Sequence, residues 1–176
     1  MRTISVKVEL REKIQFLNAL QQAGLSLGEA ALQHDKVFEN KDGGEPRVII
    51  RSETGPDGKQ THKLISRQFF ASKGSTDSYI TLIADYEQAA QIIRSLGYKL
   101  VAEVDKQRQT VDITDSITLY FDKVAKLGEY IKLERSVAKG DDLKWVQADL
   151  AETLKTLDIS ENAKLVGPYS SMAGQK

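Results

Sequence analysis

The sequence has no cysteine and no long apolar run, and each absence excludes a class of protein. Without cysteine the chain forms no disulfide bond and offers no thiolate as a metal ligand or nucleophile, which fits a reducing compartment. No apolar run approaches the roughly 18–20 residues that a membrane-spanning helix needs. The N-terminal segment MRTISVKVELRE alternates apolar and polar side chains and lacks the apolar centre of a signal peptide. We therefore expect a cytoplasmic protein without a membrane partner.

An excess of charge of one sign is also missing. The chain has 25 basic and 25 acidic residues, so its formal net charge at pH 7 is zero. A nucleic-acid-binding domain usually carries a basic surface field, and we therefore expect no nucleic-acid partner. The two histidines, His34 and His62, have no cysteine or third histidine to accompany them, which argues against a zinc site. At 176 residues the chain suits one domain over residues 1–176, as a monomer or homodimer.

Alternation of apolar and polar side chains with a period of two predicts most of the strands. We expect strands over residues 3–11, 30–38, 47–53, 60–70 and 79–83, and three more within residues 101–135. Helical spacing predicts one helix that ends at Gly24, one that begins at a capping box of Asp85 and Gln88, and a last one from Gly140. Residues 72–78 and the tail from Ser160 are expected to be loops. The pattern favours an antiparallel α+β fold.

Charged side chains recur at the polar positions of these strands. They are Lys7, Glu9, Arg11, Arg47, Arg51, Glu53, Lys63, Lys106, Arg108, Asp122, Lys132 and Glu134. Burying an unpaired charge costs several kcal/mol, so this face must either contact bulk water or line a wet cavity. In the first case it is an ordinary solvated sheet face with cross-strand ion pairs. In the second case the excess of basic residues predicts an anion ligand, and phosphate fits because Arg binds its oxygens bidentately.

Six segments, in order along the chain, resemble motifs of the CYTH superfamily of triphosphate-tunnel proteins. They are VKVELR (6–11), QHDKVF (33–38), VIIRSE (48–53), THKLI (61–65), VDKQR (104–108) and FDKVAKLGEYIKLE (121–134). This superfamily includes class IV adenylyl cyclases, thiamine triphosphatases and inorganic triphosphatases. The resemblance implies that residues 1–176 form one CYTH-like domain: a closed antiparallel β-barrel of about eight strands, with flanking helices and a polar tunnel.

The resemblance also implies roles for the charged residues. The side chains that would grip a small-molecule triphosphate or polyphosphate are Arg11, Arg51, Lys63, Lys106 and Arg108. Glu9 and Asp122 would be the catalytic acids, and Glu9 and Glu134 would hold Mg²⁺ or Mn²⁺. The implied activity is that of a metal-dependent triphosphatase or a class IV adenylyl cyclase-like enzyme.

Three departures from the family pattern weaken the expected metal site. Lys7 and Lys132 stand where the family has glutamates, and the acidic residue expected near residues 78–81 is missing. Divalent Mg²⁺ and Mn²⁺ prefer oxygen ligands, and a nearby ammonium group repels them.

Three interpretations follow from these departures. The first is an enzyme whose metal is held mainly by the substrate's phosphates. The second is a polyphosphate or nucleotide binder, weakly active or inactive, in which Lys7 and Lys132 join the binding set and replace the metal charge. The third is a structural barrel whose tunnel charges pair with one another.

Overall fold

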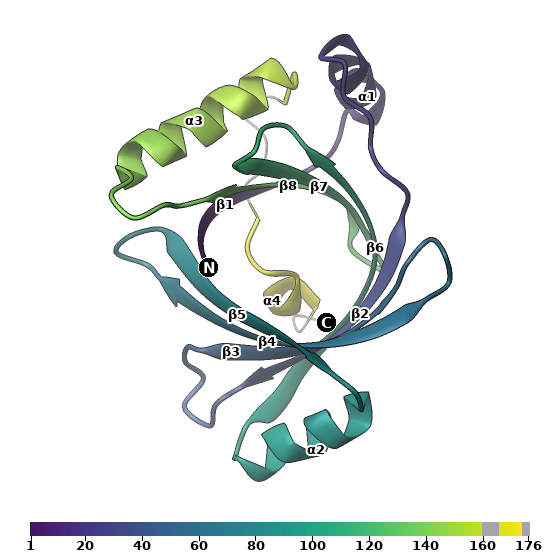
Figure 1. Ribbon diagram of the computed structural model, residues 1–176, viewed down its shortest axis with the longest axis vertical. Coiled ribbons are helices and arrows are strands. Elements are labelled where there is room, and N and C mark those ends of the chain that lie inside the picture. The colour runs from purple at the N-terminus through teal and green to yellow at the C-terminus, as the bar shows by residue number, and fades with distance from the viewer. Residues whose placement is uncertain (160–165, 174–176) are drawn as a thin grey trace.

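Eight antiparallel strands close into a barrel in the computed structural model of the protein, which describes residues 1–159 and 166–173. Around the barrel the strands follow the order β1-β5-β4-β3-β2-β6-β7-β8 (Figure 1). Their bounds are β1 Arg2–Glu9, β2 Ala31–Glu39, β3 Arg47–Thr54, β4 Gln60–Phe70, β5 Ser75–Ile83, β6 Lys99–Asp112, β7 Ile117–Val124 and β8 Gly128–Ser136. The closed antiparallel α+β barrel expected from the resemblance is confirmed.

Three helices pack against the outside of the barrel. They are α1 (Lys13–Gln22), α2 (Tyr86–Ser95) and α3 (Leu143–Thr156). Figure 1 shows α1 and α3 on one side of the ring and α2 on the opposite side. In the described parts of the chain, each helix is too short or too polar to serve as a membrane span.

The predicted alternation of side chains decides which residues face the helices. On β7, Ile117, Leu119 and Phe121 belong to the apolar cluster that α1 and α3 cover. The intervening Tyr120 and Asp122 contact Arg108, Glu134 and other charged residues of the barrel interior. Because the strands alternate so regularly, the larger apolar clusters lie on the outer wall under the helices, whereas the inner wall carries the charged residues together with two smaller apolar clusters.

Local signals explain where the helices begin. The carboxylate of Asp85 accepts a hydrogen bond from the backbone N–H of Gln88 at 2.9 Å, as the predicted cap requires. At α3 the capping residue is Asp142, whose side chain accepts from the N–H of Lys144 at 2.9 Å. Helix α3 therefore begins slightly later than Gly140 suggests.

The expectation of a loop over residues 72–78 is wrong in its second half. Strand β5 begins at Ser75 because this segment pairs with both β4 and the start of β1. The pairing with β1 is short: only Arg2 and Thr3 of β1 lie opposite residues of β5. A guanidinium–carboxylate pair between Arg2 and Asp77, 2.8 Å long, reinforces this junction.

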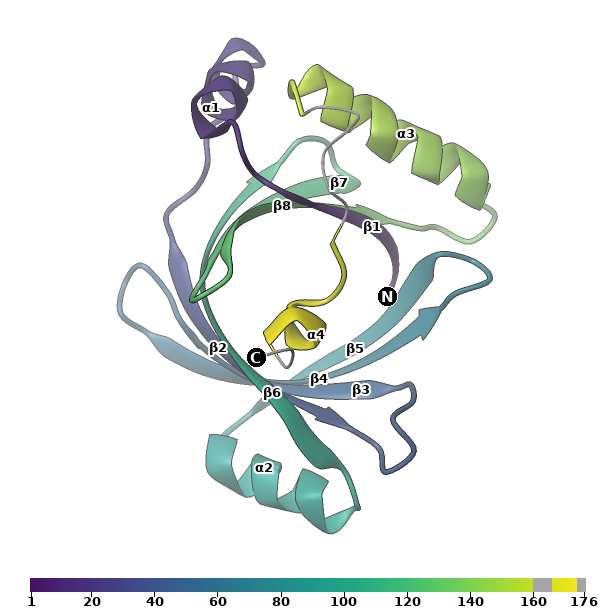
Figure 2. The same cartoon turned by 180° about the vertical axis from the view of Figure 1, so that it is seen from behind.

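The C-terminal tail differs from the loop expected from Ser160 onward. Residues 160–165 lie outside the described part, but Tyr169–Ala173 form a short helix, α4, so the expectation is wrong there. Both views place α4 inside the ring of strands (Figures 1 and 2). The segment leading to it is tied to β1, since the N–H of Val166 donates to the carbonyl of Lys7 at 3.0 Å.

Candidate functional site

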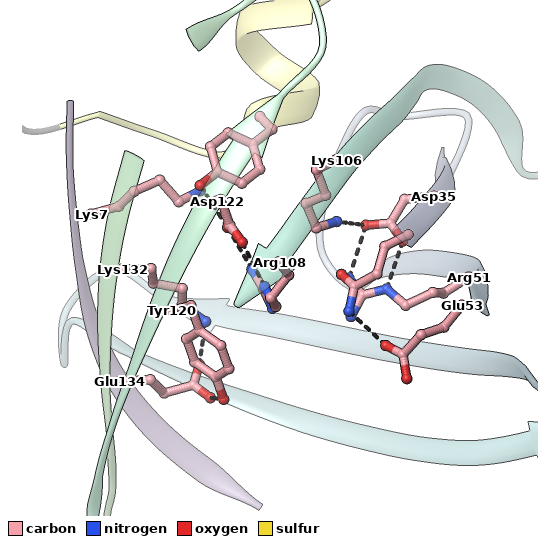
Figure 3. A network of polar contacts seen from close by, with 12 residues as sticks. Lys7, Asp35, Arg51, Glu53, Lys106, Arg108, Tyr120, Asp122, Lys132 and Glu134 are labelled. Carbon is pink, nitrogen blue, oxygen red and sulfur yellow. Dashed lines mark hydrogen bonds and ion pairs between the residues drawn. The ribbon is translucent and has the colours of Figure 1, made fainter. Parts of the chain in front are cut away.

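The barrel interior gathers cationic side chains that lie far apart in the sequence. A cavity of about 80 Å³ at its centre is lined by six of them: Lys7, Arg51, Arg67, Lys106, Arg108 and Lys132. Figure 3 shows this network, with Lys106 and Arg51 meeting at Asp35 and Arg108 meeting at Asp122. The charged face therefore lines a tunnel and is not an open, solvated sheet face.

Asp35 is the first of two carboxylates that hold tunnel cations in place. Arg51 binds it bidentately, with N–O distances of 2.6 and 2.8 Å, and Lys106 donates to it at 2.5 Å. Burial alone would raise the pKa of Asp35, but the charges of Lys106 and Arg51 outweigh that effect and hold the pKa well below its usual range. Asp35 is therefore ionised and fully committed to its two partners.

Asp122 is the second such carboxylate, and its side chain is completely buried. Arg108 binds it bidentately at 2.7 and 2.6 Å, and the hydroxyl of Tyr169 in α4 donates to it at 2.8 Å. Burial tends to raise the pKa of Asp122, yet the hydrogen bonds and charge of Arg108 lower it overall. A carboxylate that accepts three hydrogen bonds is a poor proton acceptor. In this arrangement Asp122 is therefore not free to act as a general base, as a catalytic role would require.

A third acidic residue, Glu53, organises the neighbouring part of the tunnel wall. Its two oxygens accept from Lys63 at 2.7 Å and from the side-chain amide of Gln33 at 2.6 Å. Lys63, expected to grip a triphosphate directly, is thus joined to the site through Glu53.

Lys7 and Lys132 lie directly opposite each other on β1 and β8. Lys132 forms an ion pair with Glu134, whereas Lys7 donates to the carbonyl of Gly167 at 3.2 Å and lies 3.6 Å from the centre of the Tyr169 ring. Burial, followed by the repulsion from Lys132, lowers the pKa of Lys7 to about 7. Burial likewise lowers the pKa of Lys132 to about 8, although Glu134 opposes the shift.

Arg67 differs from the other tunnel guanidiniums. Within residues 1–159 and 166–173, no carboxylate forms an ion pair or hydrogen bond with it. Burial, followed by the nearby charge of Arg51, lowers its pKa, although the negative charge of Glu134 opposes the shift. Among the described residues, Arg67 and Lys7 therefore have no paired carboxylate, and Lys7 adds positive charge to the tunnel when its amine is protonated.

The structure separates the residues expected to hold a metal ion. Glu9 lies opposite Tyr130 and Glu134 lies opposite Ser5, four strand positions away, or about 13 Å. Glu9 pairs with Arg11, and Glu134 pairs with Lys132. In the described residues no group of three His, Cys, Asp or Glu side chains is placed to hold a metal. The donor set of this tunnel does not fit a divalent ion.

Arg11 also lies away from the cavity. Strand β1 ends at Glu9, and the Arg11 side chain is 70% exposed, 3.4 Å from the Glu9 carboxylate. Of the expected binding residues, the structure brings Lys7, Arg51, Lys106, Arg108 and Lys132 together, and it leaves Arg11 outside.

Sequence reasoning missed three members of the site: Asp35, Arg67 and Tyr169. Asp35 lies in a segment that resembles the family, two residues after Gln33 on the same side of β2. Arg67 follows Lys63 by four residues, so the period of two places both on the inner wall. Tyr169 has no comparable local signal, because its position depends on the path of the tail.

Comparisons with known proteins agree with this architecture. The family model described as "CYTH domain" matches residues 45–169. A protein of Methanocaldococcus jannaschii named "Putative adenylate cyclase MJ0240" is 26% identical over 183 residues, which cover 99% of each chain.

Two solved structures resemble the whole fold. One, named as a putative adenylate cyclase from Vibrio parahaemolyticus, has a TM-score of 0.78 at 15% identity and covers 97% of this chain and 96% of its own. The other is the Hippeastrum protein HpAC1, described as a putative adenylyl cyclase that reveals a dominant triphosphatase activity. Its TM-score is 0.55 at 14% identity, with 93% of both chains covered.

Proposed function

This chain belongs to the CYTH family, and from that premise we propose that its tunnel binds a linear phosphoanion of the triphosphate class without a divalent metal ion. The observation that carries the proposal is the guanidinium of Arg67, which lines the central cavity beside Arg51 and Arg108 and has no carboxylate partner among the described residues. A phosphate chain supplies the acceptor oxygens that this guanidinium lacks, and the bond is charge-assisted on both sides.

The arrangement of acids and amines supports the metal-free part of the proposal. CYTH proteins generally depend on a metal, yet here Lys7 and Lys132 face each other across adjacent strands. Two ammonium groups at this position attract phosphate oxygens and repel a divalent cation. The acids Asp35, Asp122 and Glu134 are each committed to a basic partner.

Helix α4 limits access to this site. Ligand sites for small molecules usually have volumes of roughly 300–1,000 Å³, whereas the central cavity measures about 80 Å³ with Tyr169 among its walls. A triphosphate therefore binds when α4 moves out of the lumen. Its oxygens then replace the carbonyl of Gly167 as the acceptor for Lys7. Asp122 loses the hydroxyl of Tyr169 but keeps both bonds from Arg108.

Calorimetric titration with tripolyphosphate in EDTA tests this proposal. The wild-type protein is expected to bind, and Arg67→Met is expected to bind at least tenfold more weakly, because a hydrogen bond to a charged group contributes about 1.5–3 kcal/mol. Arg47→Met is the matched control, since Arg47 lies opposite Arg67 on β3 but pairs with Glu39 at 2.9 Å.

Two results would contradict the proposal in different ways. Binding that appears only after Mg²⁺ or Mn²⁺ is added would refute the metal-free part. Failure of the wild-type protein to bind tripolyphosphate and ATP, with or without metal, would refute the phosphoanion role itself.

A second candidate function is turnover of the bound triphosphate, as a triphosphatase or a class IV adenylyl cyclase-like enzyme. It is favoured by the Methanocaldococcus jannaschii relative, which is named "Putative adenylate cyclase MJ0240" and matches over 99% of both chains, and by the triphosphatase activity described for the Hippeastrum protein. Release of phosphate from tripolyphosphate, or of cyclic AMP from ATP, measured across Mg²⁺ and Mn²⁺ concentrations, decides this point. Absence of both products under all conditions would exclude this candidate.

A further inference from the structure

Strand β5 has an edge that the barrel pairs only in part. Its contact with the N-terminal strand ends where Met1 and Ser78 exchange two backbone hydrogen bonds, each 2.9 Å long. Beyond this contact β1 and β5 run apart (Figures 1 and 2). No strand of the described chain pairs with residues 79–83 on this side, although β4 pairs with them on the other. We call residues 79–83 the β5 edge.

The backbone of the β5 edge presents hydrogen-bonding groups in the geometry of a sheet. In an antiparallel ladder the N–H and C=O of one residue point to the same side, and the side alternates from residue to residue. Because those of Ser78 point toward β1, those of Ile80 and Leu82 point to the same, open side. The register with β4 continues without a bulge as far as Ile83, so the alternation holds throughout.

The side chains of the β5 edge are uncharged and are exposed on both faces of the strand. Tyr79 is 68% exposed on one face, and Ile80 and Leu82 are 58% and 71% exposed on the other. Natural proteins protect an open edge with charged residues, proline or a bulge, and the segment YITLI has none of these. An apolar edge of high β propensity predicts pairing with another strand.

A second copy of the same edge fits this segment. A twofold axis places the midpoints of two identical antiparallel strands opposite each other, and the midpoint of residues 79–83 is Thr81. Ile80 of one copy then lies opposite Leu82 of the other, and both direct their backbone groups into the joint. A register shifted by one residue would oppose residues whose backbone groups point away. The register centred on Thr81 uses every unpaired backbone group of the β5 edge.

We propose that the β5 edges of two copies of this chain pair antiparallel about Thr81 and form a twofold-symmetric dimer. Thr81 then lies opposite Thr81 of the second copy, and Tyr79 lies opposite Ile83 of the second copy. Thr–Thr pairs and pairs of an aromatic with a β-branched residue both stabilise antiparallel strands. Because the segment carries no charge, symmetric pairing brings no like charges together. The dimer does not depend on which ligand the tunnel binds.

Disulfide cross-linking tests the register, because the chain has no native cysteine. Thr81→Cys places two thiols opposite each other at the twofold axis, where a Cα–Cα distance of about 4.5–5.5 Å suits a disulfide bond. Tyr79→Cys is the matched control on the same face, since its two copies lie four strand positions apart, or about 13 Å. With air and copper–phenanthroline as oxidant, Thr81→Cys is expected to form a covalent dimer at least tenfold faster than Tyr79→Cys.

Sedimentation equilibrium measures the association without a cross-link. The wild-type protein is expected to be a dimer that dissociates on dilution. Thr81→Lys is expected to raise the dissociation constant at least tenfold, because it places two ammonium groups opposite each other at the axis. Ile92→Lys is the control and should leave the constant unchanged, because Ile92 is also exposed but lies on α2, away from the β5 edge.

Three results would overturn the proposal. One is a wild-type protein that stays monomeric at every concentration, which would assign the β5 edge to a different chain. Another is a dimer that Thr81→Lys leaves intact, which would place the interface elsewhere. The third is equally fast cross-linking of Thr81→Cys and Tyr79→Cys, which would contradict the register. The cross-linking result stands even if Thr81→Lys fails to fold.

Discussion

Replacing Tyr169 by phenylalanine should open the tunnel and strengthen anion binding. The substitution removes the hydroxyl that donates to Asp122 at 2.8 Å, but keeps the ring beside Lys7 and its contact with Tyr130 at a centroid distance of 5.2 Å. Asp122 retains both bonds from Arg108, so the barrel itself is expected to keep its stability. The change therefore acts mainly on the docking of α4.

The magnitude follows from the lost hydrogen bond. A hydrogen bond to a charged group contributes about 1.5–3 kcal/mol, which corresponds to a tenfold to hundredfold shift between the docked and undocked states of α4. Because an anion binds only the undocked state, its apparent dissociation constant should fall by the same factor until that state becomes the major one. A chain that ends before Val166 should give the upper limit of the effect.

Calorimetric titration with tripolyphosphate measures this shift directly. Tyr79→Phe is the control, since Tyr79 is 68% exposed on β5 and lies outside the cavity lining. An affinity that is unchanged or weaker in both Tyr169→Phe and the shortened chain would refute the view that α4 competes with the ligand.

Two further predictions concern the charges of the tunnel. Tripolyphosphate affinity should fall as the pH rises from 7 to 9. The reason is that three tunnel amines lose their charge over this range: the pKa is about 7 for Lys7, about 8 for Lys106 and about 8 for Lys132. Calorimetry across this range measures the affinity, and an affinity that does not change with pH would contradict the prediction. The double substitution Lys7→Glu with Lys132→Glu should make tripolyphosphate binding depend on Mg²⁺ or Mn²⁺, because it places two carboxylates opposite each other on β1 and β8. If the double variant binds tripolyphosphate in EDTA as tightly as the wild type does, the prediction is wrong.

The barrel wall was largely predictable from the sequence. Strong alternation along β7 and β8 indicated which residues face the helices, and the cap at Asp85 indicated the start of α2. Alternation alone left open whether the charged face was a solvated surface or a tunnel lining. That choice depends on closure of the sheet, which pairs residues far apart in the chain and has no local signal.

The site was less predictable, and particular residues show why. Arg67 is flanked by Ser66 and Gln68, so it lacks the apolar neighbours that mark a strand residue with one buried side. Arg11 continues the alternation of β1, yet the chain leaves the sheet at Glu9 and places its side chain in solvent. The role of Tyr169 depends on tertiary contacts with Asp122 and Lys7, which no local pattern encodes.

The paired carboxylates have a consequence for selectivity. Arg51 and Arg108 are already locked by Asp35 and Asp122 before any ligand arrives. An incoming anion therefore meets a preorganised frame and loses little side-chain entropy in ordering it. Once α4 has left the lumen, differences in affinity among anions should then reflect how well the spacing of their charges matches these two fixed guanidiniums.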